Sequence, residues 1–354
     1  MAAPGREMPS NKITTPELIE KINPKNKELY ERFLKNLSTK CSPKTIRTYR
    51  SNFNIFFVWN LQHNENKFFV DIKKFELMDF FDKGSVDWNW SPNRYAHVHS
   101  TLSSFSDWIM KMYDEKYPQF RNIVKLIDKQ IKQNVRKKSI FKKEDFDVLM
   151  QWLSDNDKIQ EQCLLGLLMA SGTRISEVER FTTDIIDLEH TAFEGLFIET
   201  TEEIKVKGRG VHGKMIPRYL ITNFFKPYYE NWLPIRNEII EKRGAEPHNK
   251  IFIKSTGEPA TESTFRSWMT KWDEHLPQHF YPHAARHFWT SYLSYIGLEK
   301  ELIQQLQAWS TDALVDVYND NTIKDKKWKS LDKLKSALEN ESPILSENTE
   351  NNSL

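Results

Sequence analysis

The sequence predicts a mainly α-helical chain with a small antiparallel β-sheet, an α+β protein of two domains. Apolar residues recur at helical spacing through the first 130 residues. The segment 191–221 instead combines β-type residues with closely spaced glycines. A basic segment at 129–143 separates the two patterns, and 354 residues are enough for two cores. We therefore expect a helical domain over 15–128 and a mixed domain over 144–322.

The first domain contains a strongly periodic helix. In "TIRTYRSNFNIFFVWN", Ile46, Tyr49 and Phe53 fall on one face of a helix. Ser42 is placed to cap the N-terminus of this helix, with Pro43 at its first position. The stretches "LYERFLKNL" and "VHSTLSSFSDWIMKMY" repeat the same period. Together they favour a small helical bundle.

The segment 129–143 contains seven Lys or Arg residues and no Asp or Glu. Two interpretations of it remain open. It is either a solvated interdomain linker or a segment that lies along a phosphate backbone, where each basic contact releases counterions. In the second interpretation Lys132, Arg136, Lys137 and Lys138 contact DNA.

The second domain begins with the amphipathic pattern "KEDFDVLMQWL". The stretch "QEQCLLGLLMASGTRISEVERF" then predicts a buried helix, a tight turn of small residues and a second helix. The β-type segment is interrupted by glycines that indicate a flexible hairpin: Gly208, Gly210 and Gly213. Helical patterns return at 225–243, 262–274 and 284–306.

Both ends of the chain are expected to lie outside the fold. Residues 1–14 precede the first helical pattern, include a second methionine, and resemble a dispensable leader. Residues 323–354 begin as a helix and continue as an acidic, polar tail of a composition typical of disorder.

Composition excludes several classes of protein. Hydrophobic residues make up 39% of the chain and charged residues 28%, which is normal for a globular protein. The formal net charge of +2 does not by itself indicate a nucleic-acid partner. Cys41 and Cys163 are too few for a disulfide framework or a zinc site. No apolar run approaches the roughly 20 residues of a membrane span, so we expect a cytoplasmic protein with no membrane partner.

Several residues with phosphate chemistry occur in the second half. Arg174 lies in "ASGTRISEV", where a helix opens after a small-residue turn, and an arginine can bind two phosphate oxygens at once. His283 and Arg286 lie three residues apart, on one helix face. Each of these features is weak when taken alone. The complete set of residues that we consider together as one candidate site is Arg174, Lys207, His283, Arg286, Trp309 and Tyr318.

The order and spacing of this set resemble the catalytic domain of the tyrosine recombinase, or phage integrase, family. The family pattern is an arginine in a "TG-x-R-x-x-E" turn, a hairpin lysine, an H-x-x-R-H motif, and a His or Trp nine residues before a tyrosine. The matching stretches here are "SGTRISE", "KVKG", "HAARH" and "AWSTDALVDVY". The stretch "SPKTIRTYRSNFNIFF" resembles in type the family's helical core-binding domain, so the resemblance covers about residues 18–322.

The resemblance implies cleavage and rejoining of DNA through a covalent 3′-phosphotyrosine bond, without metal, ATP or another cofactor. Tyr318 would be the nucleophile. Arg174 and Arg286 would stabilise charge on the phosphate, and Lys207 would protonate the leaving 5′-oxygen. His283 would accept a proton or hydrogen-bond the phosphate. Trp309 would donate its indole N–H to a phosphate oxygen.

Further residues are expected around this set. Glu177 is expected to orient Arg174, and His287 either supports the site or packs in the core. The residues expected to contact DNA, beyond those of the basic segment, are Lys44, Arg47, Arg50, Lys205, Arg209 and Lys214.

Three departures from the family pattern stand out. The hairpin between Lys207 and Pro217 is about two residues longer than usual, so Lys205 or Lys214 competes for the role of acid. The "L-G-H" stretch common in the family is here "Q-A-W", which puts Gln307 at a normally apolar position. Ala285 replaces a common leucine. These changes indicate a divergent member.

The resemblance also implies partners: double-stranded DNA with specific sites, and further copies of the chain in a tetramer on paired sites. The segment after Tyr318 would dock on a neighbouring copy. The origin would be bacterial, phage or another mobile element. Two alternatives remain open at this stage: a DNA-binding regulator that keeps the fold without recombination, and a monomeric enzyme similar to type IB topoisomerases.

Overall fold

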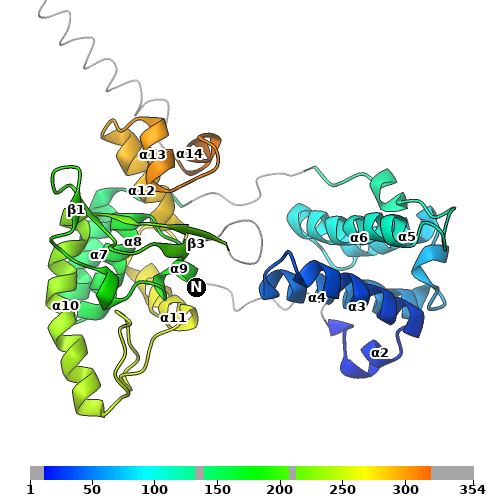
Figure 1. The fold of residues 1–354 in the computed structure, drawn as a ribbon, viewed down its shortest axis with the longest axis horizontal. Coiled ribbons are helices and arrows are strands. Elements are labelled where there is room, and N and C mark those ends of the chain that lie inside the picture. Colours follow the sequence, from blue (N-terminus) through cyan, green and yellow to red (C-terminus); the bar gives the residue numbers. More distant parts are fainter. Residues whose placement is uncertain (1–11, 132–138, 207–212, 320–354) are drawn as a thin grey trace, which may run out of the picture. The chain divides into compact units, whose positions relative to one another are not determined.

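The computed structural model describes residues 12–131, 139–206 and 213–319. The chain divides into two compact units, one containing the helices from α2 to α6 and the other the elements from α7 onward. The described part is mainly helical with small antiparallel sheets, as the sequence predicts (Figure 1).

The first unit is entirely helical in its described residues. Its elements in chain order are α2 (Pro16–Glu20), α3 (Pro24–Ser38), α4 (Pro43–His63), the 3₁₀ turn η1 (Phe69–Asp71), α5 (Lys74–Val86), α6 (Pro92–Met112) and η2 (Ile123–Leu126). The predicted cap of α4 is present, since the Ser42 hydroxyl accepts a hydrogen bond from the Thr45 amide at 3.3 Å. Helix α6 begins in the same way, with Ser91 accepting from Arg94 at 3.2 Å.

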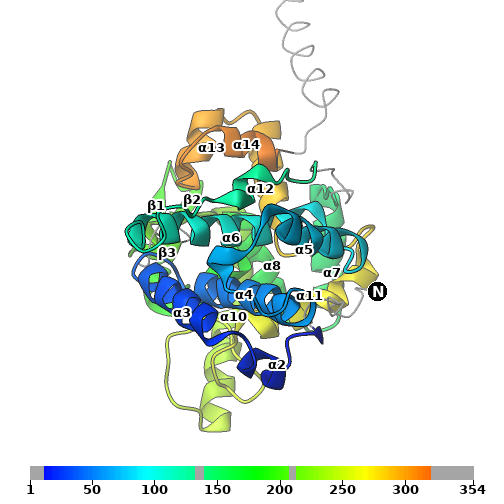
Figure 2. The ribbon, with the colours of Figure 1, turned by 90° about the vertical axis from the view of Figure 1, so that its right-hand side faces the viewer.

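Aromatic side chains fill the core of the first unit. Phe53 and Phe56 of α4 are fully buried, and Phe105 of α6 packs edge-on to Phe53 with ring centroids 4.9 Å apart. Figures 1 and 2 show α3 lying alongside α4, and α5 alongside α6. The periodicity read from the sequence therefore corresponds to the buried face of each helix.

The second unit contains helices and short strands. Its helices are α7 (Lys143–Asp155), α8 (Ile159–Ser171), α9 (Ile175–Val178), α10 (Thr222–Arg243), α11 (Glu262–Trp272), α12 (Ala284–Tyr295), α13 (Lys300–Leu306) and α14 (Ala313–Tyr318), with 3₁₀ turns η3 (Thr183–Ile185) and η4 (Asp273–His275). The predicted helix over 284–306 is thus divided into α12 and α13. The break contains Gly297, whose φ of +99° interrupts a right-handed helix.

The strands form two antiparallel sheets. They are β1 (Thr191–Ala192), β2 (Phe197–Glu199), β3 (Ile204–Val206), β4 (Lys214–Ile216) and β5 (Tyr219–Ile221). Strand β2 lies between β1 and β5, with Ile198 opposite Leu220, and β3 pairs with β4. The single small sheet expected from the sequence is therefore two sheets. The segment between β3 and β4 contains residues 207–212, which lie outside the described residues.

Helix α8 runs through the core of the second unit. Most of its residues are buried, including Cys163, and it packs against α7, α10, α12 and β5. Figures 1 and 2 both show α13 and α14 together beside α12. The carboxyl end of α8 consequently lies next to the elements that carry the predicted site residues.

Candidate active site

The turn after α8 presents Arg174. Gly172 ends the helix in the left-handed conformation, with φ of +55°. The Arg174 guanidinium donates to Glu177 across 2.8 Å, and the same carboxylate accepts from the Arg174 amide and from the Thr173 hydroxyl at 3.2 and 3.0 Å. Glu177 is 1% exposed. Glu177 therefore holds the Arg174 guanidinium from the buried side of the turn. Helix α9, which carries Glu177, is only four residues long.

Arg286 of α12 reaches the same turn. Its Nη1 donates to the Gly172 carbonyl at 2.9 Å, and the residue is 1% exposed. Its Nε and Nη2 are buried and have no hydrogen-bond partner within the described residues. Burial first, and then the charges of Arg174 and Arg218, lower the pKa of Arg286. A buried guanidinium with two unused donors is suited to an anion.

Trp309 and Tyr318 cover this guanidinium. Their rings stack with centroids 5.1 Å apart, and the Arg286 Cζ lies 4.9 Å from the Trp309 ring and 5.2 Å from the Tyr318 ring. The buried Trp309 Nε1 also lacks a hydrogen-bond partner among the described residues. The His287 ring lies 4.9 Å from that of Tyr318. Two of the unused donors thus belong to Arg286 and one to Trp309, beside the same tyrosine.

His283 stands at the start of α12, with part of the residue open to solvent and its ring partly desolvated by the neighbouring side chains. The partial burial of its ring, followed by the charges of Arg286 and Arg174, lowers its pKa below the ordinary value of 6.5. This shift favours the neutral imidazole, the form that can accept a proton.

Lys205 of β3 and Lys214 of β4 are exposed on either side of the hairpin segment. The remaining predicted residues of the hairpin and of the basic segment lie outside the described residues: Lys207, Arg209, Lys132, Arg136, Lys137 and Lys138.

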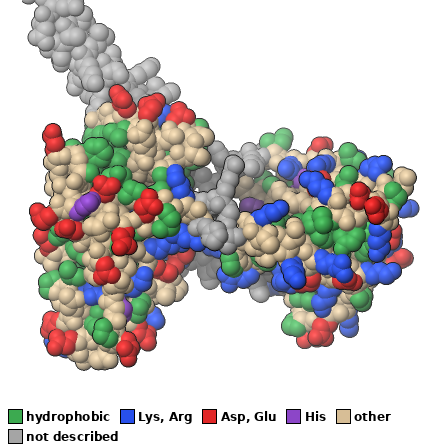
Figure 3. All heavy atoms as spheres, in the orientation of Figure 1, with side chains coloured by type: hydrophobic (Ala, Val, Ile, Leu, Met, Phe, Trp, Pro, Cys, Tyr) green, Lys and Arg blue, Asp and Glu red, His purple; other side chains and the backbone are tan. Residues whose placement is uncertain are grey.

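The predicted DNA-contacting residues of α4 differ in their surroundings. Lys44 and Arg47 are exposed. Arg50 instead makes a two-pronged ion pair with Glu31, one contact of which is 2.8 Å. Figure 3 shows basic side chains interspersed with acidic ones on the visible face of this unit. The net charge of the chain therefore says little about where an anion would bind.

Arg218, which belongs to none of the sequence motifs above, is 1% exposed and lies between β4 and β5. Its Nη2 donates to the Ser171 carbonyl at 3.0 Å, and its Nη1 donates to the Gln307 side chain at 3.3 Å. An arginine inside the apolar run "MIPRYLI" was the available signal, because such a residue requires buried partners.

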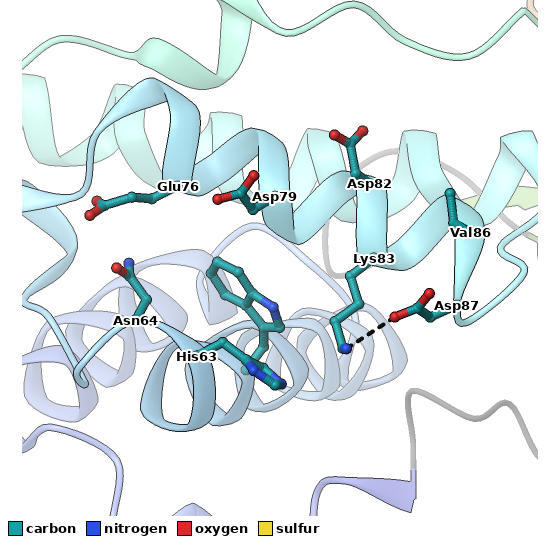
Figure 4. A pocket seen from close by; sticks show the side chains of 9 residues that line it. His63, Asn64, Glu76, Asp79, Asp82, Lys83, Val86 and Asp87 are labelled. Atoms are coloured by element: carbon teal, nitrogen blue, oxygen red, sulfur yellow. Dashed lines mark hydrogen bonds and ion pairs between the residues drawn. The ribbon is translucent and has the colours of Figure 1, made fainter.

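A hollow in the first unit has a different character. It lies between α4 and α5, and Figure 4 shows Glu76, Asp79, Asp82 and Asp87 around it. Lys83 pairs with Asp87 at 3.1 Å, and Glu76 is bound by Lys67. Such a wall of carboxylates repels phosphate, so this hollow is not a candidate for DNA binding.

The described residues contain no group of three or more His, Cys, Asp or Glu residues that could hold a metal ion. None of their helices is long and apolar enough to span a membrane.

Comparison with known proteins bears on the same region. Residues 139–324 match the model of the phage integrase family. The chain belongs to that family. The tyrosine recombinase XerC of Psychromonas ingrahamii is 25% identical over 281 residues, 78% of this chain and 85% of that protein. XerC of Bacillus subtilis is 25% identical over 162 residues, which covers 45% of this chain and 49% of that protein.

Solved structures of integrases share the fold. The Tn1549 transposon integrase in complex with transposon right end DNA aligns with a TM-score of 0.61 at 15% identity, over 87% of this chain and 98% of that one. A lambda integrase tetramer bound to a Holliday junction gives a TM-score of 0.59 at 15% identity, over 83% of this chain and 76% of that one. With its family and relatives, the chain is a site-specific recombinase of the tyrosine class, and the regulator alternative is not favoured.

Proposed function

We propose that this recombinase cleaves and rejoins DNA at specific sites through a covalent bond between Tyr318 and a 3′-phosphate. The Tyr318 oxygen attacks the scissile phosphorus, the bond from phosphorus to the 5′-oxygen breaks, and the reverse attack by a 5′-hydroxyl rejoins a strand. The phosphodiester bond energy is retained in the protein–DNA bond, so the cycle needs no ATP.

Each charged group has its own role in the reaction. Arg174 and Arg286 stabilise the negative charge on the non-bridging oxygens in the transition state. His283, whose neutral form is favoured because burial and two arginines lower its pKa, accepts the tyrosine proton. Lys207 of the hairpin protonates the leaving 5′-oxygen, with Lys205 and Lys214 as competitors for that role.

The observation that carries the proposal is the set of unused donors beside Tyr318. Arg286 Nε, Arg286 Nη2 and Trp309 Nε1 are buried without hydrogen-bond partners in the described part of the chain. Leaving a buried donor unsatisfied costs on the order of 1–3 kcal/mol. A phosphate group supplies several acceptor oxygens at once, which suits a cluster of unused donors of this kind.

The packing of Tyr318 supports cleavage by the same copy that binds the phosphate. Asn319 donates to the Ser294 hydroxyl at 2.8 Å, and Lys300 bridges to Asp316 at 2.7 Å, so α14 is attached to α12 and α13 of its own chain. Tyr318 and Arg286 then act in one protomer.

We further propose double-stranded DNA as the partner and assembly of several copies on it. The Tn1549 and lambda integrase structures contain DNA, and the lambda integrase is a tetramer, which supports a tetramer on paired sites for this chain. The segment after Tyr318 would dock on a neighbour, the protein would act in the cytoplasm, and the residues 15–128, 129–143 and 144–322 would form the core-binding domain, linker and catalytic domain.

The test is a covalent-adduct assay. The substrate is a duplex selected by the protein from a random-sequence library and nicked beside the cleavage point so that rejoining cannot occur. Wild type is expected to give a protein–DNA adduct on a denaturing gel, and Tyr318→Phe none, with DNA affinity unchanged. Specific binding without any adduct in wild type would overturn the proposal.

A mixture of two inactive variants separates the two assembly modes. Tyr318→Phe retains the phosphate site, and Arg286→Ala retains the nucleophile. If each protomer uses its own tyrosine, the mixture gives no adduct. An adduct in the mixture would mean that the tyrosine is supplied by a neighbour.

A further inference from the structure

A buried network lies behind the two catalytic arginines, and it joins three separate segments of the chain. The Ser171 carbonyl, at the end of α8, accepts hydrogen bonds from Arg218 Nη2 at 3.0 Å and from Gln307 Nε2 at 2.6 Å. The Gln307 oxygen accepts from Arg218 Nη1 at 3.3 Å. Arg218, Gln307 and Ser171 are each at most 4% exposed.

Each member of this network adjoins a segment that carries a residue of the reaction. Ser171 precedes the turn that presents Arg174. Gln307 is two residues before Trp309. Arg218 follows β4, the strand that returns from the segment containing Lys207. Its backbone is fixed as well, because its amide donates to the Thr200 hydroxyl at 2.9 Å and its carbonyl accepts from the Thr200 amide at 3.0 Å.

The network also supplies charge. The Glu177 carboxylate is hydrogen-bonded to the guanidinium group of Arg174 and is close enough to those of Arg218 and Arg286 to interact with their charges. Burial alone would raise its pKa, but the charge of Arg218 first, then the charge and hydrogen bonds of Arg174, lower it to about 2. The carboxylate that holds Arg174 therefore stays ionised at working pH partly because Arg218 is behind it.

Stability alone does not account for this arrangement. The Nε of Arg218 is buried and makes no hydrogen bond within the described residues. Well-packed apolar residues of similar volume often replace a buried charged network at no cost in stability. An apolar pair at positions 218 and 307 would fill the same space.

We infer that Arg218, held by Gln307, is a positioning residue for strand cleavage: it fixes the Arg174 turn, the Trp309 segment and the end of β4 relative to one another. This inference rests on the proposed function of the site. It predicts that removing Arg218 slows cleavage more than it weakens DNA binding, because misplacement by about 1 Å can cost a factor of about 100 in rate.

The experiment compares three variants with wild type on the nicked duplex selected by the protein itself. Arg218→Met removes the charge. The double variant Arg218→Met with Gln307→Leu removes the charge and also the amide left without its partner. Arg236→Met is the matched control, since Arg236 is a 4% exposed arginine of α10 that binds the backbone carbonyls of His248 and Lys250, both at 2.6 Å.

Arg218→Met is expected to lower the rate of adduct formation by about 10- to 100-fold, with DNA affinity within about twofold of wild type. The double variant is expected to unfold at a temperature closer to that of wild type and still to cleave slowly. The pH below which the double variant loses cleavage activity is expected to be higher than for wild type. Without the charge of Arg218, Glu177 becomes protonated at a higher pH and then releases Arg174. Arg236→Met is expected to unfold at a lower temperature but to cleave within about twofold of wild type while folded.

The outcomes distinguish a positioning role of Arg218 in cleavage from a purely structural role. If the double variant folds and cleaves at the wild-type rate with an unchanged pH profile, Arg218 is only structural and the inference is wrong. If Arg218→Met alone does not fold, the double variant decides the question. If wild type itself forms no adduct, the proposed function fails, and the inference that rests on it fails too.

Discussion

At the scale of single residues, Glu177 shows how the site depends on one buried charge. Its carboxylate is 1% exposed and accepts three hydrogen bonds. Glu177→Gln keeps the shape but leaves Arg174 and Arg218 without a counter-charge. We expect a loss of about 3 kcal/mol in the free energy of unfolding at pH 7, since breaking a buried pair is costly. Denaturant unfolding measures it.

The pH dependence of this loss is a second test of the same charge. The pKa of Glu177 is lowered from 4.5 to about 2, so its contribution is present above pH 4.5 and is lost as the pH falls toward 2. The stability difference between wild type and Glu177→Gln should therefore be about 2 kcal/mol smaller at pH 3 than at pH 7. An equal difference at both values would show that the carboxylate is not held ionised.

The sharp turn before Arg174 depends on a second single residue, Gly172. Its φ is +55°, and an added Cβ would lie 2.9 Å from both Gln307 Nε2 and Trp289 Cγ. Gly172→Ala should cost about 2–4 kcal/mol, the sum of backbone strain and overpacking. Gly244→Ala is the control, because Gly244 also ends a helix, with φ of +60°, but a Cβ there meets nothing within 4 Å.

Gly244→Ala should therefore cost only the backbone strain, about 1–2 kcal/mol. Thermal unfolding of the two variants gives the comparison. Equal losses at the two positions would mean that the space around Gly172 adjusts freely, and that the turn is not constrained by Gln307 and Trp289.

At the scale of helices and strands, the caps of α4 and α6 are local features that can be tested alone. Ser42 and Ser91 each accept a hydrogen bond from the amide three residues on. Replacing either serine with alanine should lower the free energy of unfolding by about 1 kcal/mol. The control is Ser51→Ala, an exposed position inside α4, which should be neutral or slightly stabilising because alanine is the better helix former. If Ser51→Ala lowered the free energy of unfolding as much as Ser42→Ala, the loss at Ser42 could not be assigned to its capping hydrogen bond.

The same local character explains which elements the sequence predicts. Helix α4 has a cap, a proline at its first position and a clear apolar period, so its start at Pro43 follows from the sequence. The pairing of β2 with β5 connects residues about 20 positions apart and has no local signature. The same reason applies to α14, a short helix held by contacts with α12 and α13.

The residues of the candidate site likewise fall into those with a sequence signal and those without one. Arg174, His283, Arg286, Trp309 and Tyr318 were identified from their order and spacing, and the structure brings Arg286, Trp309 and Tyr318 into contact. Arg218 was missed because its importance comes from burial among residues distant in the sequence. Gln307 was visible as a polar residue at a usually apolar position, but its partner was not.

At the scale of the whole molecule, DNA binding depends on where uncompensated positive charge lies rather than on the net charge of +2. Lys44 and Arg47 of α4 are exposed, whereas Arg50, on the same helix, is paired with Glu31. Because a cation that contacts phosphate releases a counterion, Lys44→Gln and Arg47→Gln should each reduce the slope of log affinity against log salt by about 0.9.

Arg50→Gln provides the comparison, since it removes a charge that Glu31 already offsets. Its effect on the salt slope should be clearly smaller than that of Lys44→Gln or Arg47→Gln. Affinity for the selected duplex, measured by fluorescence anisotropy between about 50 and 200 mM salt, gives all three slopes. If Arg50→Gln gives the largest change, Arg50 exchanges Glu31 for phosphate when DNA binds, and its ion pair with Glu31 of α3 belongs only to the free protein.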